Sequence, residues 1–588
     1  MTLSAYLLLL LLLLLRCHSH LFFLAIIIRK VPNELNDMVK RYRHGTPLVR
    51  SHDFHCLESG HPYGVLPWGN RFLPGAAPPV AVGTPLLRDD DECWNHILTF
   101  LDGTSLARMA QVNRYFYVAG HSPELWRDLV LRRLEYSNTK KDNDSNTIHV
   151  MEQSWKDTYA RLFCANGAAY RTPHVPMAVP GVYSDFWYRL HSCRAFGIPD
   201  AWYHPSSSNN DNDSDPCALD CVSHETMNAE RFFVEYEQPN KPVILQGAAK
   251  SWPAFTKWND ASYCRQQTKG RNFRATSGVA PLPAQFSLEA YFQYSAMPWL
   301  EEAPVYLFDR NALVPHSPLW NDFHPALCQT CPFWDPATPQ HDLFQYLGEG
   351  RRPDHTWWIV GPRRSGSVFH IDPNATHAWN AAVVGRKRWI FYPPGVTPPG
   401  VHPSADGDSV ALPLSVGEWL LTFWEEHLQR QATAPPHERP LEGTAFPGDV
   451  LFVPHGWWHM VINLDDVNMA ITHNYVAQSN LSSVLKFLSE KRDQVSGCRD
   501  RAEAIQPEHL YEEFVAALND KHPAWLQEAL NEPDWTCAAW SRSSGAPEED
   551  NNTKENQQSS SSSPSSCGVS IMSKAKTEES TSFSFSFL

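Results

Sequence analysis

The stretch GPRRSGSVFHIDPNATHAWNAAVVGRKRWIFYPP, residues 361–394, carries a His-X-Asp pair inside an alternating apolar run. Residues i and i+2 of a β-strand point to the same face, so His370 and Asp372 can project together into one cavity. A histidine, a carboxylate and one distant histidine form the facial triad of non-haem Fe(II) sites, which leaves coordination positions open. His459, within PGDVLFVPHGWWHMVINL (447–464), is the candidate for the distant histidine.

A lone His-X-Asp triplet is most often a pair of ordinary polar residues at a strand edge, so its neighbours decide the interpretation. Lys387 lies in a second strand-like run, KRWIFY (387–392). A lysine that faces into an apolar barrel is costly unless it meets an anion, and a dicarboxylate co-substrate would supply one. Ser367, three residues before His370, could donate its hydroxyl to the same carboxylate.

The segment from about Arg231 to Val476 resembles a JmjC domain of the Fe(II)/2-oxoglutarate oxygenases. Within that family it is most similar to the branch of arginine demethylases and lysyl hydroxylases first described as phosphatidylserine receptors. The matching words are VYLFD (305–309), DLFQYLGEGRRPDHTWWIVGPRRSGSVFHIDPNATHAWNAAVVGRKRW (342–389) and FPGDVLFVPHGWWHMVINLDDVNMAITHNY (446–475). Sequence segments of this length are highly specific when they occur together.

The resemblance implies a role for each matching polar residue of these words. The implied Fe(II) ligands are His370, Asp372 and His459. The residues implied around the distal carboxylate of 2-oxoglutarate are Lys387, Ser367 and Tyr306, in a pocket also lined by Asn380, Thr472 and Asn474. Ser367 departs from the pattern, because the related branch has threonine there, but the hydroxyl group is kept.

Residues 86–132, LLRDDDECWNHILTFLDGTSLARMAQVNRYFYVAGHSPELWRDLVLR, predict a small helical module. Apolar residues recur at helical spacing in its first part, at Trp94, Ile97, Leu98 and Leu101. Asp102 and Gly103 interrupt this helix, Ser105 is predicted to cap the next one, and Pro123 is predicted to open a short third helix.

This module resembles an F-box, down to its VNR…LW ending. The resemblance implies docking of a Skp-type adaptor, and with it recruitment to a cullin ubiquitin ligase. The alternative is a small helical module that only packs on the oxygenase.

The whole chain is predicted to be an α+β multidomain protein. Many short strands with period-2 patterning favour a β-barrel or sandwich, and the family implies the cupin- or jelly-roll-like double-stranded β-helix. The predicted segments are a Leu-rich start (1–28), an irregular lead-in (29–84), an F-box-like module (85–135), a helical and aromatic region with the polar linker Ser206–Asp215 (136–229), the JmjC domain (230–478), C-terminal helices (479–540) and a Ser-rich tail expected to be disordered (541–588).

The start of the chain, MTLSAYLLLLLLLLLRCHSHLFFLAIII, leaves several interpretations open. Leu7–Leu15 could be the apolar part of a signal peptide or a membrane anchor, or the product of a mis-assigned translation start. No positive charge precedes the run, and Arg16 interrupts it. We favour a nuclear or cytoplasmic protein, while the apolar tract keeps a membrane or secretory signal open.

Composition excludes some classes of protein. The formal net charge of −15 provides no global basic field, so direct base-specific binding of nucleic acid is not expected. An acidic protein suits a cationic substrate. The 13 cysteines are scattered, and the Cys328-X-X-Cys331 pair is interpreted as packing thiols rather than as a zinc site, which would need four ligands.

Two hypotheses about function come from different classes. The first is an Fe(II)- and 2-oxoglutarate-dependent dioxygenase that uses O2, with ascorbate as reductant, on protein side chains. Demethylation of arginine on histone tails or other Arg/Lys-rich segments is favoured, and lysyl hydroxylation is kept open. The second is a substrate receptor of a ubiquitin ligase that uses the JmjC domain for recognition. Residues 479–530 show helical periodicity. In the related branch the helices after the barrel mediate dimerisation, so the resemblance makes a homodimer one option.

Three further histidines near the predicted site are interpreted as structural. His455 lies at a strand-to-turn corner close to His459. His473 is flanked by Thr472 and Asn474, so a strand would turn it away from them, and His377 is a similar case.

Overall fold

The structure is a computed structural model that describes residues 61–80, 91–138, 147–164, 176–195, 218–277, 283–297, 301–314, 317–323, 342–499 and 501–531. The predictions for the Leu-rich start, the linker Ser206–Asp215, the Cys328–Cys331 pair and the Ser-rich tail lie outside these residues. Within the described part of the chain, every helix is too short or too polar to cross a bilayer.

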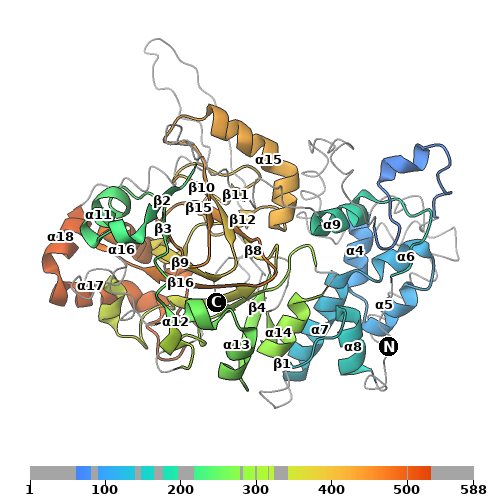
Figure 1. Ribbon diagram of the computed structural model, residues 1–588, viewed down its shortest axis with the longest axis horizontal. Coiled ribbons are helices and arrows are strands. Elements are labelled where there is room, and N and C mark those ends of the chain that lie inside the picture. Colours follow the sequence, from blue (N-terminus) through green and yellow to red (C-terminus); the bar gives the residue numbers. More distant parts are fainter. Residues whose placement is uncertain are drawn as a thin grey trace, which may run out of the picture.

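Two β-sheets face each other in the middle of the molecule (Figure 1), which confirms the predicted jelly-roll fold. The ten-stranded sheet has the order β1-β5-β4-β6-β7-β16-β9-β14-β3-β2. Its strands are β1 (Thr147–Ile148), β2 (Asp220–Ser223), β3 (Val243–Gln246), β4 (Asn272–Thr276), β5 (Ala284–Ser287), β6 (Tyr306–Asp309), β7 (Thr356–Gly361), β9 (His377–Val384), β14 (Val450–Val453) and β16 (Asn468–Tyr475).

The smaller sheet has four strands in the order β13-β10-β15-β8. They are β8 (Gly366–His370), β10 (Lys387–Tyr392), β13 (Leu441–Ala445) and β15 (Trp458–Asn463), and β11 (His402–Pro403) pairs with β12 (Val410–Ala411) nearby. Apolar side chains of both sheets, such as Trp389, Phe391 and Leu451, meet in one buried cluster. In such a sandwich, the residues of each strand alternate between the inner and the outer face of the sheet. This alternation produces the period-2 pattern in the sequence.

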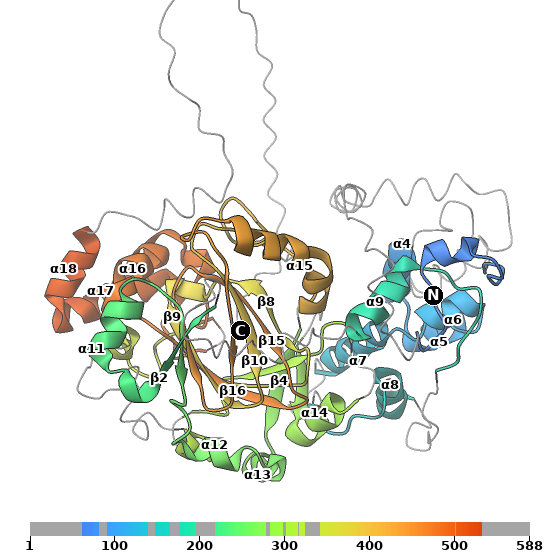
Figure 2. The same ribbon diagram turned by 45° about the horizontal axis from the view of Figure 1, so that its top comes forward.

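Helices cover the sheets on several sides, and Figures 1 and 2 both place the N-terminal and C-terminal groups on opposite sides. The N-terminal group is α4 (Asp91–Thr99), α5 (Gly103–Met109), α6 (Arg114–Ala119), α7 (Pro123–Asn138), α8 (Trp155–Phe163) and α9 (Asp185–Ala195). The C-terminal group is α16 (Leu481–Glu490), α17 (Pro507–Lys521) and α18 (Pro523–Asn531). Shorter helices between the strands are α11 (Ala229–Phe232), α12 (Pro253–Lys257), α13 (Ala261–Gln267) and α14 (Leu288–Ser295).

A long inserted helix, α15 (Val416–Thr433), lies between β12 and β13 in the chain. It packs Trp419 and Leu420 against the four-stranded sheet, on the side that carries Phe369 and Ile390. The helix is therefore a packing element of the jelly roll.

The F-box-like helices differ in detail from the prediction. The cap of α5 is Asp102 rather than Ser105, because the Asp102 carboxylate accepts the Ser105 backbone N–H at 2.7 Å. Both residue types cap helices well, so local sequence did not separate them. Gly103 then packs against Tyr159, whose ring would lie 2.4 Å from a Cβ atom. Helix α7 is also longer than the short helix predicted.

The large sheet begins earlier in the chain than the expected boundary at residue 230. Strand β1 follows α7 and pairs in parallel with β5, and β2 pairs in parallel with β3. Two to four residues carry too little periodicity to be recognised as strands. The N-terminal helices share one apolar core with the sheet, since Trp126 and Val130 of α7 belong to the same buried cluster as Phe286 and Tyr294.

Candidate metal and co-substrate site

The predicted metal triad comes together at the ends of two neighbouring strands. His370 is the last residue of β8, and the antiparallel pairing of β8 with β15 places His459 directly opposite it. Asp372 follows two residues after His370. One ligand atom from each of the three side chains lies within 4.8 Å of the others. The two imidazole rings are 4.1 Å apart, and His459 Nε2 lies 3.9 Å from Asp372 Oδ1.

Backbone carbonyls orient both histidines. Nδ1 of His370 lies 2.8 Å from the Val368 carbonyl oxygen, and Nδ1 of His459 lies 3.1 Å from that of Trp457. A carbonyl only accepts, so Nδ1 carries the proton in each ring and Nε2 keeps its lone pair. Such a second hydrogen bond is the usual way in which proteins fix a metal-binding histidine.

Burial sets the charge of the three groups. It lowers the pKa of His370 to about 3, with His459 adding to the effect, and lowers the pKa of His459 to about 4. Burial also raises the pKa of Asp372 to about 6. At pH 7 the cluster therefore has two neutral imidazoles and one carboxylate, the protonation states that a divalent metal needs. Asp372 Oδ2 is buried and has no hydrogen-bond partner among the described residues, so the donor set fits a cation.

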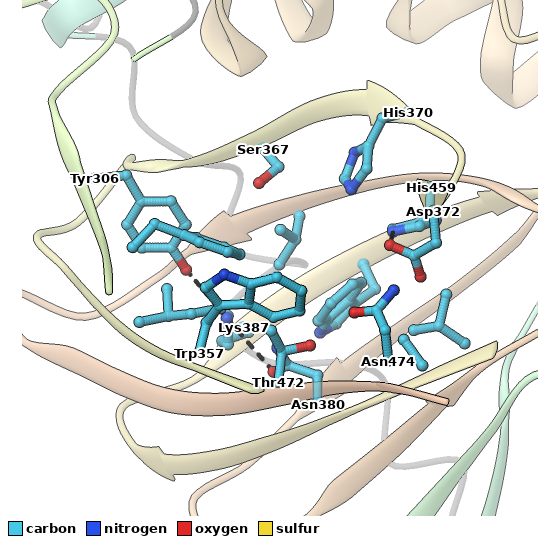
Figure 3. A pocket seen from close by; sticks show the side chains of 16 residues that line it. Tyr306, Trp357, Ser367, His370, Asp372, Asn380, Lys387, His459, Thr472 and Asn474 are labelled. Atoms are coloured by element: carbon cyan, nitrogen blue, oxygen red, sulfur yellow. Dashed lines mark hydrogen bonds and ion pairs between the residues drawn. The ribbon is translucent and has the colours of Figure 1, made fainter. Parts of the chain in front are cut away.

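A buried lysine occupies the other end of the same cavity (Figure 3). Lys387 is 1% exposed, and its Nζ lies 3.1 Å from Tyr306 Oη and 3.4 Å from Asn380 Oδ1. In the part of the chain that the structure describes, no carboxylate forms an ion pair with it, and burial lowers the pKa of its ammonium group to about 7. Gly361 permits this arrangement, since a Cβ there would lie 2.6 Å from the Tyr306 ring. The arrangement suits an incoming anion.

The cavity wall contains every residue predicted for the co-substrate pocket. These are Lys387, Ser367, Tyr306, Asn380, Thr472 and Asn474. Thr472 donates its hydroxyl to the Trp379 carbonyl, and the Asn474 amide donates to Thr376 Oγ1. Their side chains are therefore held in place before any ligand binds.

The sequence reading missed the apolar part of the wall. Phe308, Trp357, Trp389 and Val453 line the cavity as well. Trp389 follows Lys387 by two residues on β10, so strand alternation alone could have placed it on the same face. Trp357 offers no such signal, because it precedes another tryptophan of the same strand.

The three histidines interpreted as structural lie outside the triad. His377 accepts the His455 backbone N–H on Nδ1 and contacts Ser479 through Nε2, and His455 lies within 3.3 Å of Ser483. His473 hydrogen-bonds Thr356 and stacks on Trp379. Each histidine joins secondary structure elements instead of facing the cavity.

Known protein families match two parts of the chain. Residues 337–481 match the cupin-like domain family, and residues 91–132 match the F-box-like family. The first match contains all three triad residues, and the second covers α4 to α6 and most of α7.

Three similar proteins extend the comparison. "Arginine-specific demethylase JMJ22" of Arabidopsis thaliana is 34% identical over 475 residues, which cover 79% of this chain and 82% of that protein. "Lysine-specific demethylase JMJ21" of the same plant is 28% identical, over 79% of this chain and 43% of that protein. "Bifunctional arginine demethylase and lysyl-hydroxylase psr-1" of Caenorhabditis elegans is 30% identical, over 45% of this chain and 62% of that protein.

The match to the first relative covers 79% of this chain, and residues 91–132 and 337–481 match the F-box-like and cupin-like families. The triad and the buried lysine lie in one cavity of the jelly roll. The chain therefore belongs to the F-box-containing JmjC proteins and is an Fe(II)- and 2-oxoglutarate-dependent oxygenase.

Proposed function

We propose that this oxygenase demethylates arginine side chains on a cationic protein segment such as a histone tail, with His370, Asp372 and His459 as its Fe(II) ligands. The observation that carries the proposal is the single cavity with a two-histidine, one-carboxylate cluster at one end and Lys387 at the other. The names of two relatives include arginine demethylase. The net charge of −15 suits a cationic substrate segment. We also infer a nuclear or cytoplasmic location for the protein.

Each polar group of the cavity has a distinct task in this proposal. Bound Fe(II) supplies the activation of O2 that oxidises a C–H bond. His370 and His459 present neutral Nε2 donors in fixed orientations, and Asp372 adds the negative charge. Lys387, with Tyr306 and Asn380 beside it, holds the far carboxylate of 2-oxoglutarate. The aromatic wall excludes water from the reacting atoms.

The position of the oxidised carbon decides the product. Oxidation of an N-methyl group gives a hydroxymethyl amine that loses formaldehyde, so the methyl group is removed. Oxidation of a lysine side-chain carbon gives a stable hydroxylysine. A third relative's name refers to lysine, so a test must include methyl-lysine and unmodified lysine peptides as well as methyl-arginine peptides.

Mass spectrometry of such peptides, incubated with protein, Fe(II), ascorbate and 2-oxoglutarate, tests the proposal directly. We expect methyl-arginine peptides to lose the mass of one CH2 unit for each methyl group removed, with release of formaldehyde. Gain of one oxygen without formaldehyde would make the chain a hydroxylase. If only methyl-lysine peptides lost a methyl group, lysine would replace arginine as the proposed target. Each turnover would consume one O2 and convert 2-oxoglutarate to succinate and CO2, with one oxygen atom going to succinate and the other to the oxidised C–H bond. Absence of succinate in every reaction would therefore contradict the enzyme assignment.

The affinity for 2-oxoglutarate is expected to fall as pH rises above 7. Burial lowers the pKa of Lys387 to about 7, and a bound carboxylate favours its charged form. Below pH 7 the ammonium is already present, so affinity is flat. Above pH 7 binding must take up a proton, and the dissociation constant rises towards about tenfold per pH unit. Calorimetric titration at saturating Mn(II) measures this. Lys387→Arg keeps its charge and serves as the control, with an expected flat profile; a flat wild-type profile would contradict the assignment.

We further propose that the F-box-like module binds a Skp-type adaptor and so recruits a cullin ligase. The family match over residues 91–132 supports this second function. The module also presents two apolar side chains to solvent, Phe100 at 57% and Val112 at 49% exposed. Exposed apolar groups are suited to a protein interface. Adaptor binding and catalysis use different parts of the molecule, so they can coexist.

The double variant Phe100→Asp/Val112→Asp is expected to weaken adaptor capture at least about tenfold, because two charges replace apolar contacts. Pull-down with purified adaptor and cullin measures it. Succinate formation should stay unchanged, which shows that the variant is folded. Val234 and Leu530 are exposed outside the module. The control double variant Val234→Asp/Leu530→Asp should therefore capture the adaptor as wild type does. Equal capture by all proteins would argue against this surface, and no capture by wild type would remove the ligase function.

A further inference from the structure

A buried ion pair joins the F-box-like module to the oxygenase. Arg127 of α7 is 1% exposed and hydrogen-bonds Asp128 of the same helix at 3.1 Å. The other end of its guanidinium lies 3.7 Å from a carboxylate oxygen of Glu301, which is also 1% exposed. Glu301 lies in the segment that leads into β6. Among the described residues Arg127 is the cation that pairs with Glu301, so its removal leaves this carboxylate buried without a counter-charge.

Glu301 also contacts helix α14 and so connects that helix to Arg127. The Tyr294 hydroxyl donates to Glu301 Oε2 at 2.6 Å, and the Trp155 indole N–H donates to Oε1. The same Tyr294 oxygen accepts the backbone N–H of Val305 at 2.8 Å. Val305 immediately precedes Tyr306, whose hydroxyl lies beside Lys387 in the cavity.

Helix α14 also holds the backbone that follows Tyr306. The Tyr291 oxygen accepts the Leu307 N–H at 3.2 Å and lies 2.8 Å from the Val360 carbonyl of the adjacent strand β7. The backbone on both sides of Tyr306 is therefore attached to α14 through tyrosine hydroxyls. Of these two tyrosines, Tyr294 is the one that the Arg127–Glu301 pair orients.

Helix α7 contacts the same segment at a second point. Glu124 accepts the Glu302 backbone N–H at 3.3 Å, and the Glu302 carboxylate accepts the hydroxyl of Ser415, the N-cap of α15. Residues 301 and 302 are thus fixed by the F-box-like module on one side and by the inserted helix on the other.

We propose that Arg127 is a positioning residue for the co-substrate pocket. Its charge keeps Glu301 in place, Glu301 orients the Tyr294 hydroxyl, and Tyr294 sets the start of β6 so that Tyr306 lies against Lys387. The interior of the F-box-like module then supports the 2-oxoglutarate site, while its exposed side chains Phe100 and Val112 remain the proposed adaptor surface. This inference rests on the proposed roles of Tyr306 and Lys387.

The decisive variant is Arg127→Met in the full chain, with Arg127→Lys as the conservative change. We expect Arg127→Met to raise the dissociation constant of 2-oxoglutarate about tenfold or more at saturating Mn(II), with Mn(II) affinity within about twofold of wild type. KM for 2-oxoglutarate should rise more than kcat falls. Arg127→Lys should recover part of the loss. The neutral pair Arg127→Met/Glu301→Gln should recover part of it, because the amide oxygen can still accept from Tyr294, while the bond from the Trp155 N–H is lost.

Arg189→Met is the matched control. Arg189 pairs with Glu418 of α15 at 2.5 Å, so it also joins an N-terminal helix to the oxygenase, but its ion-pair partner lies on α15 and not in the segment before β6. We expect it to leave 2-oxoglutarate binding unchanged. If Arg127→Met does not fold, Tyr294→Phe replaces it, since it removes only the hydroxyl that links Glu301 to Val305. The same loss of 2-oxoglutarate affinity is expected.

Two results would overturn the inference. One is a folded Arg127→Met or Tyr294→Phe protein that binds 2-oxoglutarate like wild type. The other is an equal loss of metal and 2-oxoglutarate affinity, which would indicate general damage to the fold. Lys387→Met separates this failure from failure of the proposed function. If Lys387→Met weakens 2-oxoglutarate binding and the Arg127 and Tyr294 variants do not, the pocket assignment stands and only the positioning role is lost.

Discussion

Asp372→Ala is expected to lower succinate formation by more than about 100-fold, because it removes one of the three proposed Fe(II) ligands. Changes in groups that merely orient metal ligands typically cost 10- to 100-fold, so loss of a ligand should exceed that range. Asp372 is the only carboxylate of the described residues in the three-residue cluster. The measurement is succinate release at saturating Fe(II) and 2-oxoglutarate, together with the Mn(II) dissociation constant.

Thermal unfolding of the metal-free proteins separates lost binding from lost folding. Burial raises the pKa of Asp372 to about 6, so its carboxylate destabilises the metal-free fold progressively as pH rises from about 4 through 6. Asp372→Ala removes this buried charge and should be at least as stable as wild type at pH 7 without metal. Asp465→Ala, which breaks an ion pair with Arg386 nearer the surface, serves as the activity control. Undiminished succinate release by Asp372→Ala would exclude Asp372 as a ligand.

Lys387→Met is expected to raise KM for 2-oxoglutarate by about 30-fold to several thousand-fold. Truncation of one partner of a buried, hydrogen-bonded charge pair costs roughly 2–5 kcal/mol. Lys387 is the buried cation of the cavity, and its neighbours Tyr306 and Asn380 are uncharged. Steady-state kinetics with varied 2-oxoglutarate and calorimetry at saturating Mn(II) measure the effect.

Metal affinity is the internal control for this second variant, because Lys387 lies at the far end of the cavity from the triad (Figure 3). Lys387 lies four positions before Phe391 on β10, and Phe391 pairs with His459, so the two backbone positions are about 13 Å apart along the strand. We expect Mn(II) to bind Lys387→Met as it binds wild type. A KM within about twofold of wild type would place the co-substrate carboxylate elsewhere.

Local periodicity determined the parts of the site that lie on a single strand. The place of Lys387 in a strand follows from local periodicity. Spacing also predicted that Asp372 lies near His370, but β8 ends at His370, so Asp372 lies beyond the strand and alternation is not what places it. The structure places the strands where these runs predicted them, for example β9 and β10. Family resemblance added Tyr306, Asn380, Thr472 and Asn474, which composition and spacing could not single out, and all four line the cavity.

Only the tertiary structure decided how distant segments meet. The register that sets His459 opposite His370 depends on how β15 and β8 pair. The entry of β1 into the sheet and the contact between Arg127 and Glu301 join residues far apart in the chain. The sequence by itself determined which faces of its strands and helices are apolar, because that is a property of neighbouring residues. Which faces meet is set by the packing of the whole core, so the link between the F-box-like module and the co-substrate pocket could not be seen before the chain was folded.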